Sequence, residues 1–156
     1  MTENINEVMI RKAERADSER VYQLLLLIAD LHRKGRPEMF EGLVSKYSLE
    51  QVRERLSNDE SGVFVATIEK LTVGYVFCDI IKEGSCKTLY IDDLCVDPSV
   101  RKRGIGKKLL DAAKQYAEEQ KCDFVMLNVW EFNSDAVSFY KNYGFKTRTR
   151  HMEIKL

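Results

Sequence analysis

Residues 94–108 read LCVDPSVRKRGIGKK and pass from an apolar stretch through a turn into a helical pattern. The turn starts at Asp97-Pro98, because an Asp-Pro pair favours turn initiation and proline cannot donate a hydrogen bond within a sheet. After the turn, apolar residues recur at helical spacing, at Ile105, Leu109, Ala112, Ala113, Tyr116 and Ala117. This stretch therefore predicts a strand, a tight connection and an amphipathic helix, in that order.

Two glycines, Gly104 and Gly106, stand at the start of the predicted helix among basic residues, which are Arg101, Lys102, Arg103, Lys107 and Lys108. Glycines leave backbone N–H groups uncovered, and the helix dipole favours a negative charge at this end. The spacing differs from the Walker A motif and from the dinucleotide motif G-x-G-x-x-G. We expect a local pyrophosphate site here. The alternative is a solvated basic helix start whose glycines allow close packing.

The segments before this stretch predict strands and two helices. β-branched and aromatic residues indicate strands at 8–12, 63–69, 72–81 and 88–96. Apolar spacing predicts a helix over 18–35, and the capping box Ser48-Leu49-Glu50-Gln51 opens a second helix that runs to about Leu56. The strands over 63–96 follow one another closely, so they form an antiparallel meander.

The segments after the stretch predict a strand over 124–130, a helix over 134–142 and one or two closing strands within 145–156. A strand, a helix and a further strand imply a parallel pair with a right-handed crossover. We therefore expect an α/β fold of the mixed α+β type, with a mixed, mostly antiparallel central sheet and helices on both faces. No linker or repeat divides the chain, so residues 1–156 are expected to form a single domain.

The composition argues against several classes of partner. Because 25 Lys and Arg balance 25 Asp and Glu, no overall field attracts nucleic acid or an anionic membrane, and the short basic cluster has no aromatic platform for bases. The four cysteines lack zinc-type spacing, so we expect no metal site and reduced thiols. Residues 1–8 lack the features of a secretory signal, and the apolar run 24–29 is too short to span a bilayer. A cytoplasmic protein without a membrane anchor is expected.

Two motifs resemble those of the GNAT superfamily of N-acetyltransferases. Arg101-x-x-Gly104-x-Gly106 resembles the superfamily signature R/Q-x-x-G-x-G/A. Downstream, the second motif N-x-x-A-x-x-F-Y-x-x-x-G-F is matched by Asn133, Ala136, Phe139, Tyr140, Gly144 and Phe145. The resemblance is strong over about residues 63–145 and weak before them.

This resemblance implies a three-layer fold in which the fourth and fifth strands, here 88–96 and 124–130, splay apart to hold acetyl-CoA as the co-substrate. The backbone of Leu94, Cys95 and Val96 would pair with the pantetheine arm, and a backbone N–H near Leu94 or Cys95 would polarise the thioester carbonyl. The pyrophosphate would be held by Arg101, Lys102, Arg103, Gly104, Ile105, Gly106 and Lys107. The fold also implies that sheet edges pair between subunits, in a homodimer.

The resemblance assigns catalytic roles to Tyr140 and Asp92. Tyr140 would contact the coenzyme and protonate the leaving sulfur; the alternative is a tyrosine packed beside Phe139. Residues 90–94 are similar to the strand of diamine acetyltransferases that carries an acidic residue at the position of Asp92. Because neighbouring strand residues point to opposite faces, we expect one acid to meet the amine, and we choose Asp92 over Asp93 as the base.

Asn133 is expected either to contact the coenzyme or to cap the following helix. Cys95 has no partner histidine in sequence, so direct transfer is favoured over a covalent acyl-enzyme. Residues 32–40 would line the acceptor side, where Glu38, Met39 and Phe40 would bind a cation with an apolar stem; the alternative is a mobile loop. Trp130 and Tyr75 are core residues or further lining of that side.

The predicted function is therefore transfer of acetyl from acetyl-CoA to a primary amine of a small molecule or peptide. The acceptor classes left open are polyamines, aminoglycoside-like compounds, amino acids, and protein N-termini or lysines. The similarity around residues 90–96 favours a polyamine-like acceptor. The alternative hypothesis is a non-catalytic domain that binds or senses acyl-CoA.

Overall fold

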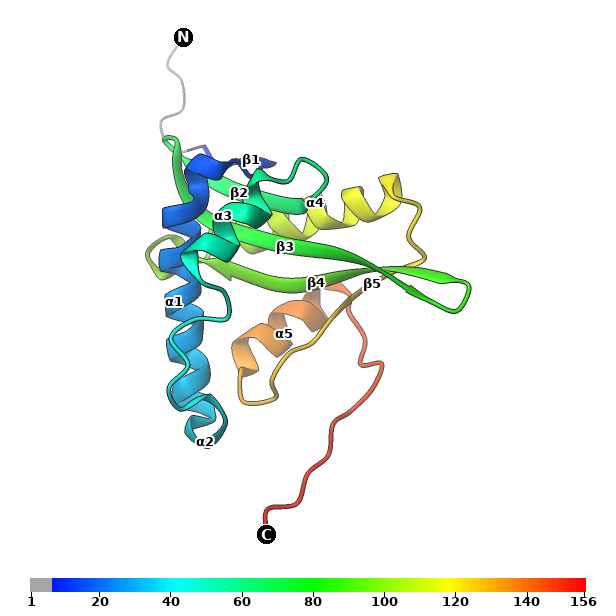
Figure 1. Cartoon of the computed structure of the whole chain (residues 1–156). Helices are drawn as coiled ribbons and strands as arrows, with labels where there is room; N and C mark the ends of the chain where they lie inside the picture. Colours follow the sequence, from blue (N-terminus) through cyan, green and yellow to red (C-terminus); the bar gives the residue numbers. More distant parts are fainter. Residues whose placement is uncertain (1–6) are drawn as a thin grey trace.

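The computed structural model describes residues 7–156. Its centre is a five-stranded sheet with strand order β1-β2-β3-β4-β5, and helices cover both faces (Figure 1). In chain order the elements are β1 (Met9–Lys12), the 3-10 turn η1 (Arg15–Asp17), α1 (Ser18–Gly35), α2 (Pro37–Phe40), α3 (Leu49–Ser57), β2 (Gly62–Ile68), β3 (Leu71–Glu83), β4 (Cys86–Val96), the 3-10 turn η2 (Pro98–Val100), α4 (Ile105–Glu119), β5 (Phe124–Leu127) and α5 (Ser134–Tyr143). The expected mixed α/β fold is confirmed.

The sheet is mixed and mostly antiparallel, as the sequence predicted. Strands β1 to β4 pair antiparallel in chain order, and β5 pairs with β4 in parallel after the crossover through α4. The β2–β3 hairpin turns at Glu69-Lys70, whose φ values of 49° and 67° are those of a tight two-residue turn. A short turn of this kind places two strands that are consecutive in the chain side by side in the sheet.

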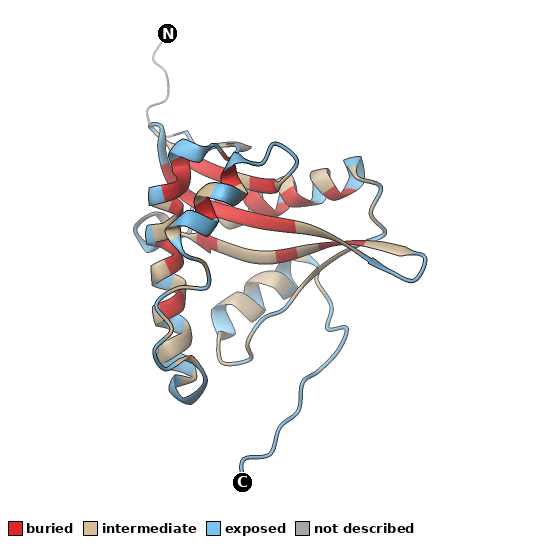
Figure 2. Cartoon of the chain, in the orientation of Figure 1, coloured by how far each residue is buried: buried red, intermediate tan, exposed pale blue. Residues whose placement is uncertain are grey.

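Each face of the sheet has its own apolar core, seen as the buried stretches of strand and helix in Figure 2. On one face, α1 and α3 pack against β3 through Leu24, Val52 and Phe77. On the other face, α4 packs through Leu109, and α5 adds Phe139 and Tyr140. Burying one such side chain contributes roughly 1.5–3 kcal/mol, so both helical layers are fixed on the sheet.

Strands β4 and β5 separate partway along their length. Their register pairs residues 88–91 of β4 with residues 124–127 of β5, whereas β4 continues to Val96 with β3 as its partner. The predicted splay is thus confirmed. The strand expected over 124–130 is shorter than predicted, because beyond Leu127 the chain turns away and places Trp130 edge-on against Phe40 of α2, with ring centroids 5.5 Å apart.

The closing strands predicted within 145–156 are absent. Residues 146–156 are exposed and run away from the sheet toward the C-terminus (Figure 1). Two ion pairs hold this segment, Arg148 with Glu83 at 3.2 Å and Arg36 with Glu153 at 2.6 Å. The prediction was wrong because a strand-like sequence also needs a neighbouring strand, and none among residues 7–156 pairs with it.

Two predictions concern the ends of the chain and the membrane. The absence of a secretory signal was predicted from residues 1–8, of which residues 1–6 lie outside the described residues. Within residues 7–156, no helix is both long and apolar enough to cross a membrane.

Candidate functional site

The start of α4 presents uncovered backbone N–H groups. The helix begins at Ile105 after Gly104, which has a left-handed φ of 71°, and the bond from Lys108 N to Gly104 O is 3.1 Å. The N–H groups of the three residues before Lys108 therefore have no partner within the helix. The preceding residues 101–104 are exposed. This is the arrangement that binds phosphate at a helix N-terminus.

Gly106 also has a packing role. A Cβ atom at this position would lie 2.9 Å from Cζ of Phe139 on α5, which is too close for a real contact. The two interpretations of the glycine motif are therefore compatible: Gly106 lets α5 approach α4, and the free N–H groups remain available for a ligand.

The end of β4 has one free edge. Leu94, Cys95 and Val96 are in register with β3, and no strand among the described residues pairs with them on the side of β5. The following turn is fixed by Asp97, whose side chain accepts a hydrogen bond from Ser99 N at 2.9 Å and forms an ion pair with Arg20. The geometry leaves backbone groups beside the splay for an extended ligand to meet.

Tyr140 lies on α5, between Phe139 and Phe145, with ring centroids at 5.3 Å and 5.7 Å. Burial, with smaller contributions from the nearby Asp93 and Cys95, raises the pKa of its phenol to about 12. Its hydroxyl makes no hydrogen bond with any other residue in 7–156. At neutral pH this phenol carries its proton and is free to donate it.

Asp92 and Asp93 lie on the same face of the sheet. Phe77 pairs with Asp93 and Cys78 pairs with Ile91, which leaves Asp92 as the extra residue of a β-bulge. Both carboxylates contact the face that α1 and α3 cover. The expectation that the two acids point to opposite faces is wrong, because a bulge adds one residue and shifts the alternation.

Asp93 is bound by a tyrosine of the core. The hydroxyl of Tyr75, a fully buried residue, donates to Asp93 Oδ2 at 2.9 Å. Burial raises the pKa of the Asp93 carboxyl to about 6, although the hydrogen bond from Tyr75 acts in the opposite direction. Of the two interpretations of Tyr75, the core interpretation is confirmed.

Asp92 is held by three residues outside both motifs. Lys46 Nζ lies 2.8 Å from Oδ1, the Tyr47 hydroxyl donates to Oδ2 at 2.5 Å, and Arg55 lies 3.8 Å from Oδ2. Burial and the contact with Asp92 raise the pKa of the Tyr47 phenol. Sequence analysis missed these residues, because Lys46 and Tyr47 come from the connection before α3 and no motif or spacing marks any of the three.

Two further predicted residues have clear local roles. The Asn133 side chain caps α5, accepting a hydrogen bond from Ala136 N at 3.4 Å, so its capping role is confirmed and its contact with a coenzyme stays a prediction. Cys95 is buried, with Sγ 3.7 Å from Leu24 O. Burial raises the pKa of this thiol to about 12, which makes it a poor nucleophile.

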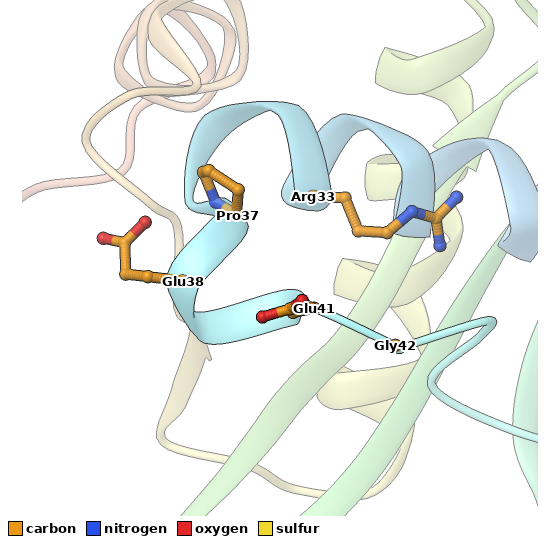
Figure 3. A pocket seen from close by; sticks show the side chains of 5 residues that line it. All are labelled: Arg33, Pro37, Glu38, Glu41 and Gly42. Atoms are coloured by element: carbon orange, nitrogen blue, oxygen red, sulfur yellow. The ribbon is translucent and has the colours of Figure 1, made fainter.

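The predicted acceptor segment forms α2 and joins an aromatic cluster. Phe40 stacks on His32 of α1 with centroids 5.2 Å apart and meets Trp130 edge-on. A surface pocket beside it is lined by Arg33, Pro37, Glu38, Glu41 and Gly42 (Figure 3). Neither Tyr140 nor Asp92 lines this pocket, so it lies at the outer end of α1 and apart from the predicted reacting groups. Met39 is exposed.

Within residues 7–156, no group of three or more His, Cys, Asp or Glu side chains is arranged to hold a metal ion. The carboxylates at the site instead meet cations and hydroxyl groups of the protein.

The chain resembles known proteins over most of its length. A model of the acetyltransferase (GNAT) family matches residues 26–145. An uncharacterized N-acetyltransferase of Methanocaldococcus jannaschii is 35% identical over 96 residues, which are 60% of this chain and 42% of that protein. The chain thus spans less than half the length of this relative.

Solved structures share the fold. A mutant of the BH1408 protein from Bacillus halodurans has a TM-score of 0.85 and 27% identity, over 95% of this chain and 99% of that one. The aminoglycoside N-acetyltransferase AAC(6')-Iy in complex with CoA has a TM-score of 0.74 over 100% of this chain and 98% of that one. Its identity is 18%, so this likeness concerns the fold alone. From the matched family model and the geometry of α4, β4 and β5, the chain belongs to the GNAT family of acetyltransferases.

Proposed function

We propose that this protein transfers the acetyl group of acetyl-CoA directly to a primary amine of a small molecule or a protein. One observation carries the proposal: β4 and β5 part beside the free N-terminus of α4, and the protonated Tyr140 lies near Asp93 and Cys95 of β4. The CoA bound to AAC(6')-Iy supports the same class of ligand here.

The residues at the splay fit acetyl-CoA as a co-substrate. The free edge of residues 94–96 would pair with the pantetheine amides, and the N–H groups at the start of α4 would bind the pyrophosphate. Exposed cations surround that helix start in a chain with no net charge, at Arg101, Lys102, Arg103 and Lys107. Asn133 and Tyr140 on the β5 side complete the proposed set.

Acetyl-CoA supplies an activated acyl group as a thioester. The acceptor nitrogen bonds to the acyl carbon, the carbon–sulfur bond breaks and the sulfur leaves as a thiolate. Tyr140 donates its proton to that sulfur as a general acid, and a backbone N–H at Leu94 or Cys95 stabilises the negative oxygen formed in the transition state. Direct transfer is favoured because burial keeps the Cys95 thiol protonated.

Asp92 is proposed to accept the proton of the ammonium, directly or through water. Lys46 supports this assignment, because its Nζ donates to both Oδ1 and the backbone O of Asp92, at 2.8 Å and 2.9 Å. A primary ammonium therefore fits this position, and we propose that the amine of the acceptor takes the place of Lys46 Nζ there. Asp93, on the same face, remains the alternative base.

The acceptor is proposed to be a small cation of the polyamine or aminoglycoside class. Asp92 and Asp93 provide negative charge at the reacting end, and Glu38 and Glu41 provide it at the outer pocket. The rings of Phe40 and Trp130 meet edge-on, with centroids 5.5 Å apart, and suit an apolar stem. All four cysteines are free, which supports a cytoplasmic location.

The test is a free-thiol release assay with acetyl-CoA against polyamines, aminoglycosides, amino acids and peptides, with calorimetric titration of acetyl-CoA alongside. We expect turnover on a polyamine or aminoglycoside. Tight binding of acetyl-CoA without turnover on any amine would instead favour the sensor. Failure to bind acetyl-CoA would contradict the proposal.

A further inference from the structure

One lysine amine of the chain already lies on the carboxylate proposed as the base. Lys46 Nζ donates to Asp92 Oδ1 at 2.8 Å and to the backbone O of Asp92 at 2.9 Å. The other carboxylate oxygen accepts a hydrogen bond from the hydroxyl of Tyr47 at 2.5 Å. Lys46 belongs to the connection between α2 and α3 and reaches this acid from 46 positions away. The chain itself thus supplies a primary amine where the proposed reaction needs one.

This amine lies at the point where β4 and β5 part. Ile91 is the last residue of β4 in register with β5, so Asp92 is the first residue beyond the paired part. The free edge of residues 94–96 begins two positions later, roughly 7 Å along an extended strand. Because a lysine ammonium is carried on a flexible four-carbon stem, Nζ can turn from the carboxylate toward this edge while the strand stays in place.

Asp93 connects the same amine with the proposed acid. Burial raises the pKa of the Asp93 carboxyl to about 6, while the hydrogen bond from Tyr75 and the charge of Lys46 act in the opposite direction. Burial likewise raises the pKa of the Tyr140 phenol, and the charge of Asp93 adds to this effect. Asp93 therefore lies close enough to both Lys46 and Tyr140 for charges to act between them, so all three groups surround one part of β4.

Lys46 differs from the other lysines that form ion pairs among residues 7–156. Two of those lysines meet an acid one turn away on the same exposed helix surface, and the side chains of the two acids are 47% and 52% exposed, in the pairs Lys34–Asp30 and Lys107–Asp111. Pairs of this kind need only the helical spacing and contribute little to stability. The side chain of Asp92 is 11% exposed, so Lys46 meets a largely buried acid.

We propose that Lys46 is itself an acetyl acceptor, and that the protein acetylates its own Lys46 Nζ when acetyl-CoA is bound and no external amine occupies the site. This inference rests on the proposed acetyl transfer and adds a modification site to it. The modified residue lies in the connection between α2 and α3, beside the base and outside both sequence motifs.

The step balances as it does for an external amine. The Lys46 ammonium passes one proton to Asp92, its nitrogen bonds to the acyl carbon, and the carbon–sulfur bond breaks with the electron pair leaving on sulfur. Tyr140 protonates that sulfur, and the second proton lost by the nitrogen restores the phenol. The products are acetyl-lysine, CoA with a free thiol and the proton that Asp92 releases to water. The amide has no charge, so the ion pair with Asp92 ends with the reaction.

The test incubates the full chain with acetyl-CoA alone and follows the acetylation of individual lysines by peptide mass spectrometry. Lys34 is the internal control, because its Nζ also lies close to a carboxylate, at 2.7 Å, but on the exposed surface of α1. We expect Lys46 to be acetylated at least about tenfold faster than Lys34, and Tyr140→Phe to slow the reaction at Lys46 at least about tenfold without changing that at Lys34.

Two further measurements use the same reaction. Lys46→Arg keeps a cation beside Asp92 but cannot accept the acetyl group in this way, so it should release almost no CoA thiol in the absence of an amine, whereas the natural chain releases thiol until Lys46 is consumed. The rate constant at Lys46 should not change with protein concentration, because the amine and the base belong to one chain. A rate constant proportional to protein concentration would overturn the inference.

Equal rates at Lys46 and Lys34, or a rate at Lys46 that Tyr140→Phe leaves unchanged, would identify ordinary chemical acetylation and also overturn the inference. The thiol-release assay with the panel of amines, run on the same preparation, separates this result from a failure of the proposed function. Turnover on an amine with Lys46 unmodified would overturn the inference alone, and neither turnover nor acetylation would overturn both. Acetylation of Lys46 without turnover on any amine would support the inference and contradict only the proposed acceptor class.

Discussion

At the bulge in β4, two neighbouring carboxylates meet very different partners. Asp92 is surrounded by the cations of Lys46 and Arg55 and the hydroxyl of Tyr47, whereas Asp93 meets the neutral hydroxyl of Tyr75. In the proposed reaction, the ammonium of the acceptor replaces Lys46 as the cation beside Asp92. The second is placed in a less polar environment, and its charge costs stability.

This difference predicts how Asp93 affects stability with pH. Burial raises its pKa from an ordinary 3.8 to about 6, so between these values the folded state binds more protons than the unfolded state, and stability falls as pH rises. Asp93→Asn still accepts the hydrogen bond from Tyr75 but cannot ionise. The free energy of unfolding of this variant minus that of the natural protein should therefore grow by roughly 1–3 kcal/mol as the pH rises from about 4 to about 7.

Urea unfolding of both proteins at intervals of about one pH unit would measure this difference. Asp59→Asn, a change in an exposed loop, serves as the matched control. A difference for Asp93→Asn that is the same at every pH would show that this carboxylate ionises equally in the folded and unfolded chain.

At the residue scale, sequence reasoning located the acids and Tyr140 but not their surroundings. Motif spacing places Tyr140 on a helix after β5, and the structure has it there. The bulge depends on the register between β3 and β4, which the sequence of one strand does not contain. Lys46 reaches Asp92 from 46 positions away, and no local pattern encodes such a contact.

At the scale of elements, the contact between α4 and α5 holds the two motifs together. Gly106 belongs to the first motif and Phe139 to the second, and a Cβ on residue 106 would lie 2.9 Å from the Phe139 ring. The Tyr143 hydroxyl adds a hydrogen bond to Asp111 of α4 at 2.7 Å. The contact of Gly106 with Phe139 thus fixes the start of the helix that would bind pyrophosphate relative to Tyr140.

Gly106→Ala should push these helices apart. We expect the added methyl to destabilise the protein by about 1–3 kcal/mol, the usual cost of overpacking. Phe139→Leu removes ring atoms at the contact, so the double variant should be less destabilised than the sum of the two single changes. Thermal unfolding of the four proteins measures this coupling, and strictly additive losses would show that Gly106 does not limit the approach of α5.

The start or end of an element could be predicted where residues close in sequence determine it. The capping box Ser48 to Gln51 forms both of its hydrogen bonds, at 2.9 Å and 3.1 Å, and α1 begins at Ser18 and ends at Gly35, where the sequence indicated. The end of β5 was missed, because the turn after Leu127 follows from the distant aromatic contacts of Trp130 with Phe40.

At the scale of the whole molecule, the charges of a neutral chain are distributed unevenly. Basic residues gather at the start of α4, whereas the acidic residues at the bulge of β4 and beside α2 pair with basic ones, as in Asp92–Lys46 and Glu38–Arg36. The order of the strands could be predicted from the turns between them. The course of the C-terminal segment could not, because its alternating pattern gives the propensity to form a strand, but no strand pairs with it among residues 7–156.

The central claim is that the protein transfers acetyl with Tyr140 as the acid, and the most direct measurement compares Tyr140→Phe with Tyr143→Phe. Both changes remove one hydroxyl from α5, but Tyr143 bonds to Asp111 and lies outside the proposed site.

We expect both variants to bind acetyl-CoA with nearly unchanged affinity in calorimetry. With the amine identified in the thiol-release assay, Tyr140→Phe should lower kcat about 10²–10⁴-fold and Tyr143→Phe should leave it nearly unchanged. Undiminished turnover by Tyr140→Phe would contradict the account.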